Sequence, residues 1–227
     1  MYVNYIQSRL YVNKKFEETF LAMVRKTKED AELTRQRIID AAREVFLARG
    51  VSRTTMEHIA EAAGVTRGAV YWHFSNKTDL FQAMREHIML PLIDRMDDTL
   101  LADESDDPLT CIEHFLCGTI HVLTENITTR QTYEIMMTKC EYVDEFANVL
   151  PKMLSNCSTI IQKIQLVYER AKLLGHLQPT SEPAQLAMDT HLFFIGLLHM
   201  WVKDTNGTNY RPYAIDFIKT HMRLRRK

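Results

Sequence analysis

Two short helical patterns joined by a tight turn constrain the fold of this chain more than any other feature of its sequence. Thr54-Thr55-Met56-Glu57 has the S/T-x-x-E form of a capping box, which predicts a helix that ends near Ala63-Gly64. After a turn of about three residues, Thr66 is expected to cap a second short helix that runs to about Phe74. A longer helix is predicted before them, because apolar residues recur at helical spacing up to a stop at Gly50. This is the helix-turn-helix pattern, although a corner between two helices of an ordinary bundle would have a similar sequence.

The rest of the chain is also predicted to be helical. Only seven glycines and six prolines interrupt 227 residues, which leaves long stretches of residues that favour helix. Breaks are expected at residues 106–108, 125–130, 175–183 and 206–207. The sequence therefore predicts an all-α protein: a three-helix N-terminal domain followed by a bundle of about six helices, so about nine to ten helices in total.

The second short helix has the polarity of a surface element. Val70 and Phe74 are four residues apart and are expected to pack inward, which leaves Arg67, Tyr71 and His73 to project outward. Arg67 stands in the first turn, where recognition helices place their base-reading side chains. Its guanidinium matches the O6 and N7 acceptors of guanine. These residues favour a helix that enters the major groove of DNA.

Smaller and polar residues around Arg67 suit the same role. Gly68 costs a helix about 1 kcal/mol relative to alanine, so a close approach of backbone to phosphate is one reason for its presence. The methyl group of Ala69 is suited to thymine, and Tyr71 and His73 can donate to phosphate oxygens. Lys77 stands at a predicted helix N-terminus, which attracts phosphate. The competing interpretation places the two consecutive aromatic residues of this helix in the core, beside a solvated lysine.

These motifs resemble the DNA-binding domain of the TetR family. The resemblance rests on TMEHIA at residues 55–60, AGVTRGAVYWHF at residues 63–74 and NKTDL at residues 76–80. Residues 24–28 and 139–142 look like the AcrR-type branch, which represses multidrug efflux pump operons. The resemblance implies Arg67 as the base-reading residue and mostly phosphate contacts for the others. The implied operator contacts are Thr55, Thr66, Arg67, Gly68, Ala69, Tyr71, Trp72, His73 and Lys77.

Three segments are expected along the chain. Residues 1–22 have no counterpart in the family pattern and are interpreted as an extension or mobile arm that precedes a possible true start at Met23. Residues 23–80 form the DNA-binding domain, and residues 81–227 form a ligand-binding and dimerisation domain. The second segment is mildly basic, whereas residues 81–218 carry roughly twice as many acidic as basic side chains. This distribution suits a protein that meets DNA through one end only.

The larger domain is expected to form a homodimer. The helix predicted at residues 183–202 is apolar over much of its circumference, so it must be covered on more than one side. In the family it would pair with the helix at about residues 150–174, which carries Ile160, Ile161, Ile164, Val167 and Leu174, to form a four-helix interface. The alternative is that these apolar residues are buried within one chain.

The same domain is expected to bind a small molecule. Twelve methionines suit a pocket that accepts dissimilar ligands, although a methionine is often a plain core residue. Met89 lies roughly where some relatives have a carboxylate that meets cationic drugs, which favours neutral or anionic apolar ligands such as phenolics. The predicted ligand-binding residues are Met89, Ile93, Met96, Phe115, Tyr133, Met137, Cys140 and Phe194.

The resulting hypothesis is a cytoplasmic repressor that a small apolar or amphipathic compound releases from a palindromic operator, bound as one or two dimers. A regulator of a metabolic operon, activating or repressing, is the main alternative. A helical-bundle enzyme is a remote one, because the chain has no nucleophile elbow, P-loop, dinucleotide fingerprint or H-E-x-x-H motif. No cofactor and no metal are expected. No membrane contact is expected either, since no apolar run reaches roughly 18 residues. Four cysteines without C-x-x-C spacing are read as reduced thiols.

Overall fold

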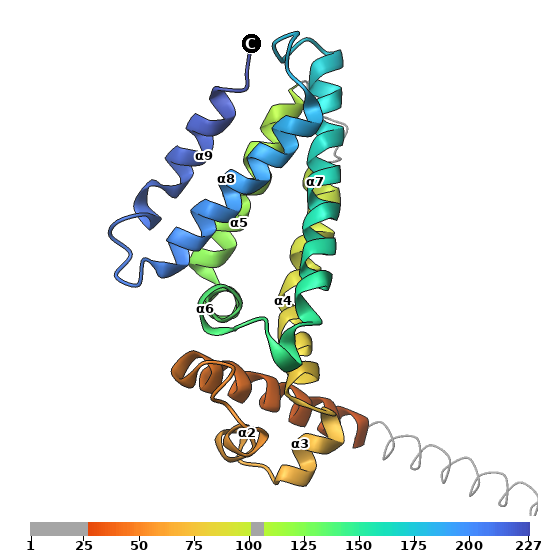
Figure 1. Cartoon of the computed structure of the whole chain (residues 1–227), viewed down its shortest axis with the longest axis vertical. Helices are drawn as coiled ribbons and strands as arrows, with labels where there is room; N and C mark the ends of the chain where they lie inside the picture. The colour runs from red at the N-terminus through yellow and green to blue at the C-terminus, as the bar shows by residue number, and fades with distance from the viewer. Residues whose placement is uncertain (1–26, 101–106) are drawn as a thin grey trace, which may run out of the picture.

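The computed structural model describes the backbone of residues 27–100 and 107–227, and the side chains of these residues except residues 87 and 89–99. The predicted extension at residues 1–22 lies outside the described residues. The described chain is all-helical and contains nine α-helices, which confirms the predicted fold class. Figure 1 shows the N-terminal helices packed at one end of the molecule and the others extending away as a bundle, hereafter the body.

The three helices at this end are the first helix (residues 27–49), α2 (Met56–Ala63) and α3 (Arg67–His73). The first helix ends before Gly50, where the sequence predicts its stop. Between α2 and α3, Gly64 adopts a left-handed conformation (φ 62°) that residues with a Cβ rarely adopt, and its N–H donates to the carbonyl oxygens of Ala60 and Glu61. This cap ends α2 abruptly and allows α3 to begin within three residues.

The cap of α2 differs from the predicted one by a single residue. The helix begins after Thr55, whose side chain accepts a hydrogen bond from the backbone N–H of His58, while the His58 ring accepts one from the N–H of Thr55. Thr54 is buried and donates through Oγ1 to the carbonyl oxygen of Gly50 (2.8 Å). The predicted capping pair of Thr54 and Glu57 is therefore wrong, and the Glu57 carboxylate is left for another partner.

Six helices form the body, as predicted. They are α4 (Lys77–Leu100), α5 (Pro108–Glu125), α6 (Ile127–Glu134), α7 (Val149–Leu173), α8 (Pro183–Lys203) and α9 (Ala214–Arg223). A π-helical turn η1 (Ile135–Lys139) and two 3₁₀ turns, η2 (Asp144–Phe146) and η3 (Arg211–Tyr213), complete the described elements. The loop predicted at residues 125–130 is wrong, because Asn126 alone separates α5 from α6 and caps α6 through its side chain.

Two apolar cores hold these helices together. One lies within the body, where helices α5, α7, α8 and α9 pack around the buried Trp201 and Tyr168. The other is shared: Phe46 and its neighbours from the three N-terminal helices pack with Phe81, Phe146 and Val149, which belong to the body. The two parts of the chain are thus joined by a common core as well as by α4, which runs from one to the other (Figure 1).

Candidate nucleic-acid interface

Helix α3 has one buried face and one exposed face. Val70 is buried on it and Phe74 just after it, as their spacing predicts. Arg67 and Tyr71 are exposed, and Trp72 has 74% of its surface accessible to solvent. The interpretation of the two aromatic residues as core is therefore wrong. An arginine and two aromatic side chains at the surface of one short helix form a suitable surface for nucleic acid.

Arg67 is held by a partner on the preceding helix. Its guanidinium forms an exposed ion pair with the Glu57 carboxylate of α2 and lies over the ring of Tyr71, 5.4 Å from the ring centroid. The hydrogen bond with Tyr71, followed by the charge of Glu57, raises the pKa of Arg67 above its usual value. Glu57 was not among the predicted site residues. When Thr55, and not Thr54, caps α2, Glu57 no longer stands at the capping-box position. Its carboxylate is then available to another side chain, and this was the signal in the sequence.

No steric requirement within the protein explains the glycine at position 68. A Cβ built on Gly68 meets only the Thr66 hydroxyl oxygen, at an ordinary contact distance of 3.8 Å. Thr66 itself caps α3 by accepting from the N–H of Ala69 (3.1 Å). The helix would therefore accept alanine at position 68. The absence of a side chain suits the approach of something from outside the chain.

The C-terminal end of α3 contacts the first helix. The ring of His73 lies 4.5 Å from the Trp72 ring and perpendicular to it. Burial, and then the charge of Arg35, lowers the pKa of His73, so the imidazole is neutral at pH 7. The guanidinium of Arg35 lies 5.2 Å from the centroid of the Phe74 ring. Arg35 adds a positive charge beside α3 that the motif comparison did not include.

Lys77 is placed differently from the other predicted contacts. It is 9% exposed, and its ammonium donates to the carbonyl oxygen of Thr54 (3.1 Å) and pairs with the Glu145 carboxylate (2.8 Å). Thr55 and Thr66 are exposed, with their hydroxyl oxygens engaged in the helix caps. Seven of the nine predicted residues thus lie on α3 or at its N-cap, Thr55 is exposed at the N-cap of α2, and the Lys77 side chain points into the protein.

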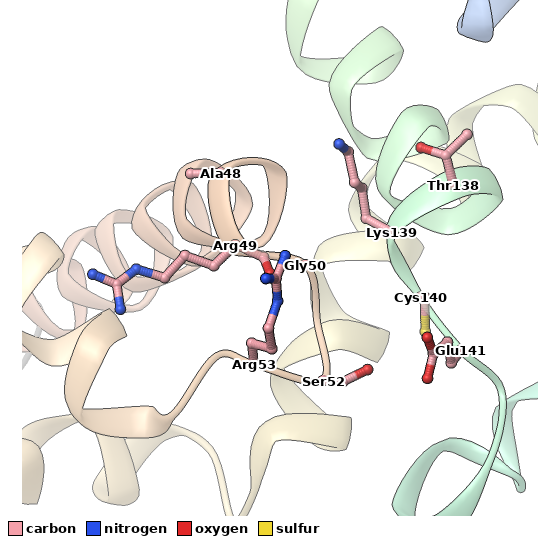
Figure 2. A pocket seen from close by; sticks show the side chains of 9 residues that line it. All are labelled: Ala48, Arg49, Gly50, Ser52, Arg53, Thr138, Lys139, Cys140 and Glu141. Atoms are coloured by element: carbon pink, nitrogen blue, oxygen red, sulfur yellow. The ribbon is translucent and has the colours of Figure 1, made fainter.

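The junction between the three N-terminal helices and the body contains a hollow of about 540 Å³ (Figure 2). On one side it is lined by residues around Gly50, and on the other by η1 and the residues after it. The N–H of Val51 donates to the carbonyl oxygen of Lys139 (2.9 Å) across this junction. In Figure 2 the Arg49 side chain points away from Lys139, and its Nη1 lies 3.2 Å from Nε2 of His58. The positive charges of the lining therefore do not converge on one point.

The predicted ligand-binding residues are divided between the two cores. Tyr133 and Phe194 are buried in the core of the body, and Phe115 and Met137 pack against it. Burial raises the pKa of Tyr133 to about 12. Cys140 lies apart from them: it packs against the shared core and lines the hollow at the junction. Three further predicted residues lie on α4 but outside the described side chains, namely Met89, Ile93 and Met96.

No metal centre or membrane-spanning helix is evident in the described part of the chain. Among residues 27–100 and 107–227, no group of three His, Cys, Asp or Glu side chains has a geometry suited to a metal ion. None of the helices that the structure describes combines the length and apolar character that crossing a bilayer requires.

Helices α7 and α8 pack against each other, and both expose apolar side chains. Most residues that the sequence assigns to a dimer contact are at least partly buried within the chain instead, because Ile164, Val167 and Trp201 belong to the core of the body. Apolar side chains that are exposed on α7, on α8 and on the adjacent α9 are Leu166, Leu173, Met188, Leu192, Met200 and Phe217, of which the sequence assigned only Met200 to the dimer contact.

Comparisons with known proteins find similar sequences and similar structures. The family described as "Bacterial regulatory proteins, tetR family" matches residues 38–84. The HTH-type transcriptional regulator TtgR of Pseudomonas putida is 37% identical over 183 residues, which cover 79% of this chain and 85% of TtgR. NalD, the secondary repressor of the MexAB-OprM multidrug efflux pump in Pseudomonas aeruginosa, has a similar structure (TM-score 0.77, 32% identity, 88% of this chain and 98% of NalD). The SmeT–triclosan complex is also similar (TM-score 0.74, 28% identity, 86% of this chain and 92% of SmeT; SmeT is from Stenotrophomonas maltophilia).

Proposed function

Because this chain belongs to the TetR family of bacterial regulatory proteins, we propose that it represses a multidrug efflux operon and leaves its operator when an apolar or amphipathic small molecule binds. The family assignment makes it a DNA-binding transcriptional regulator and sets the enzyme alternative aside. The observation that carries the proposal is the exposed side of α3, with Arg67, Tyr71 and Trp72. It is supported by NalD, a repressor of an efflux pump, which is 32% identical to this chain.

In the proposed complex, α3 enters the major groove. Arg67 exchanges its Glu57 partner for a guanine, since the pair is exposed and an exposed ion pair contributes only about 0–1 kcal/mol. Tyr71, Trp72 and His73 contact the phosphates, together with the hydroxyls of Thr55 and Thr66. Gly68 and Ala69 have side chains small enough for the backbone of α3 to approach the DNA closely. Base recognition thus rests on Arg67, and most other contacts set affinity and register.

Repression of a palindromic operator requires two copies of the chain. We propose that a second copy packs against α8, where Met188 and Leu192 are exposed, and against the neighbouring α7, which exposes Leu166 and Leu173. An exposed apolar surface of this kind marks an association site in a soluble protein. A twofold axis through this face would relate two α3 helices, and recognition of half-sites one turn apart needs them about 34 Å apart.

The proposed inducer binds in the body. Its binding site includes the apolar cluster around Phe115, Tyr133, Met137 and Phe194, which is the part of the predicted pocket that the described side chains bring together. SmeT was solved with triclosan, a phenolic compound, and this supports an apolar phenolic ligand class here. A ligand that binds one conformer more tightly by 1–3 kcal/mol weakens operator binding by about 5- to 150-fold.

DNase I footprinting of the DNA upstream of the gene for this protein, and of the nearest efflux operon, tests the proposal. The expected result is a protected palindrome that random DNA does not compete away and that triclosan or a plant phenolic exposes again. The protected length separates one bound dimer from two. Protection beside a metabolic gene would instead indicate that the protein regulates a metabolic operon. Affinity no greater than for random DNA at both regions would contradict it.

A further inference from the structure

The turn η2 of the body is inserted into the core of the DNA-binding end. Phe146, the last residue of η2, is 3% exposed, and its ring meets the ring of Phe81 edge to face at 5.3 Å. Phe81 in turn contacts Phe46 of the first helix, with ring centroids 6.2 Å apart. The residue before Phe146 is Glu145, whose carbonyl oxygen accepts a hydrogen bond from the Thr78 hydroxyl (3.1 Å). One side chain and one backbone carbonyl of η2 therefore attach it to the first turns of α4.

The ammonium of Lys77 is engaged at this same contact. An ammonium has three N–H donors. One reaches the Glu145 carboxylate (2.8 Å), another reaches the carbonyl oxygen of Thr54 (3.1 Å), and the ring of Phe146 lies 5.5 Å from Nζ. With a side chain only 10% exposed, Lys77 is surrounded by partners that belong to the protein. These partners come from the segment that leads into α2 and from η2 of the body.

We infer that Lys77 and Glu145 position the recognition helix relative to the body, and that Lys77 is not a phosphate ligand. The inference rests on the proposed function and deepens it. Lys77 follows α3 after only three residues, Phe74 to Asn76, so a fixed first turn of α4 fixes the direction in which α3 leaves the core. Thr54 ties the start of α2 to the same ammonium. The operator-binding geometry therefore depends on a carboxylate that lies 68 residues further along the chain.

The variant Glu145→Gln tests this inference by the sign of its effect. Removal of a negative charge ordinarily strengthens the binding of a protein to DNA, because the anionic backbone repels carboxylates. A positioning role predicts the opposite, a loss of operator affinity of about fivefold or more. Glu86→Gln is the matched control: it removes the same charge from an exposed ion pair between α4 and α7, with Lys152 (2.6 Å). The control should bind the operator as well as the unchanged protein or slightly better. Operator binding by Glu145→Gln that equals or exceeds that of the control overturns the inference.

The salt dependence of binding gives an independent readout. Loss of one phosphate contact makes the slope of log affinity against log salt concentration less steep by about 0.9. A dimer contains residue 77 twice, so it would lose two such contacts. For Lys77→Met we expect an unchanged slope and a loss of operator affinity similar to that of Glu145→Gln. Both changes remove the same Lys77–Glu145 ion pair. The double variant should therefore bind the operator no less tightly than the single variant with the lower affinity. A reduced slope for Lys77→Met shows a phosphate contact and overturns the inference.

Binding to random DNA distinguishes a failure of this inference from a failure of the proposed function. Fluorescence anisotropy on a duplex of the protected sequence and on a random duplex, for full-length protein, reports specific and non-specific affinity. If the unchanged protein shows no preference, the proposed function fails, while the slopes of Lys77→Met and of the unchanged protein on random DNA still decide whether Lys77 meets phosphate. If Lys77→Met does not fold, the sign of the Glu145→Gln effect decides alone. A loss confined to the operator duplex supports positioning, and equal losses on both duplexes contradict it.

Discussion

The guanidinium of Arg67 on the recognition helix is paired with the carboxylate of Glu57 on the preceding helix, and both side chains are more than half exposed. The pair connects the two short helices of the DNA-binding motif across their exposed side. It orients Arg67, the proposed base-reading residue, toward α2 when no DNA is present. It also presents a carboxylate close to the expected path of the DNA backbone, so binding must rearrange the pair.

We predict that Arg67→Ala relaxes base preference. The loss of a bidentate contact to guanine should cost about 1–3 kcal/mol at one base pair of each half-site and leave binding to random DNA less affected. Anisotropy titrations with operator duplexes substituted at single positions will measure this. Glu57→Gln frees the same arginine and should leave base preference intact. If Arg67→Ala weakens operator and random DNA equally, Arg67 does not read bases.

Gly68→Ala should change stability and DNA binding in opposite directions. Alanine removes a propensity cost of up to about 1 kcal/mol, and its Cβ finds only an ordinary contact with Thr66. Urea unfolding is therefore expected to show a more stable protein, while operator affinity falls because the added methyl holds the DNA away. Gly118→Ala, in the middle of α5 with no atom within 4 Å of its Cβ, is the control. It should stabilise the protein and leave operator affinity unchanged, and an equal affinity for Gly68→Ala would argue against close approach.

Leu192→Glu should dissociate the proposed dimer. Each exposed Leu192 side chain would lose about 1.5–3 kcal/mol of burial, and a symmetric interface contains it twice. Sedimentation velocity should show a monomer at micromolar concentration, with weaker operator binding as a consequence. Leu33→Glu, at a residue on the first helix that is 70% exposed, changes the charge equally and should remain dimeric. A variant Leu192→Glu that still sediments as a dimer would place the interface elsewhere.

Acid should destabilise the body through His221. Burial, and then the charge of Arg225, lowers the pKa of His221 to about 4, although Asp189 opposes this effect. Its Nε2 lies 3.3 Å from the Thr190 hydroxyl, and its ring stacks on Phe193. Because the unfolded chain takes up this proton near pH 6.5 and the folded one near pH 4, stability should fall as pH decreases through this interval, by up to about 3 kcal/mol.

Urea unfolding at a series of pH values between 7 and 4 measures this effect. His221→Gln should reduce the pH dependence in this interval. His114→Gln, which changes an exposed histidine on α5, serves as the control and should retain it. An identical pH profile for His221→Gln and the unchanged protein would mean that His221 does not carry the effect.

Much of the DNA-binding end is predictable from short stretches of sequence. Gly64 imposes the turn because a left-handed backbone is costly for residues with a Cβ, and the spacing of Val70 and Phe74 assigns the buried face of α3. These features depend on neighbours within about four residues, so the pattern contains them. The cap of α2 was less predictable, because Thr54 and Thr55 are equally suited to cap a helix. Burial of Thr54 against the carbonyl oxygen of Gly50 decides between them.

The sequence by itself determined the helical class, the order of the helices and the residues that α3 exposes, because helix propensity, caps and periodicity are local properties. Only the tertiary structure decided where the Lys77 side chain points and which groups it contacts. A lysine at a helix N-terminus is suited to phosphate by every local criterion, and its partner Glu145 lies 68 residues away in a short 3₁₀ turn that has no periodic signature. The folding of α4 to α7 brings η2 to Phe81, and the aromatic contact of Phe146 places the carboxylate beside the ammonium. Contacts of this kind are set by three-dimensional packing, which the spacing of residues along one helix does not encode.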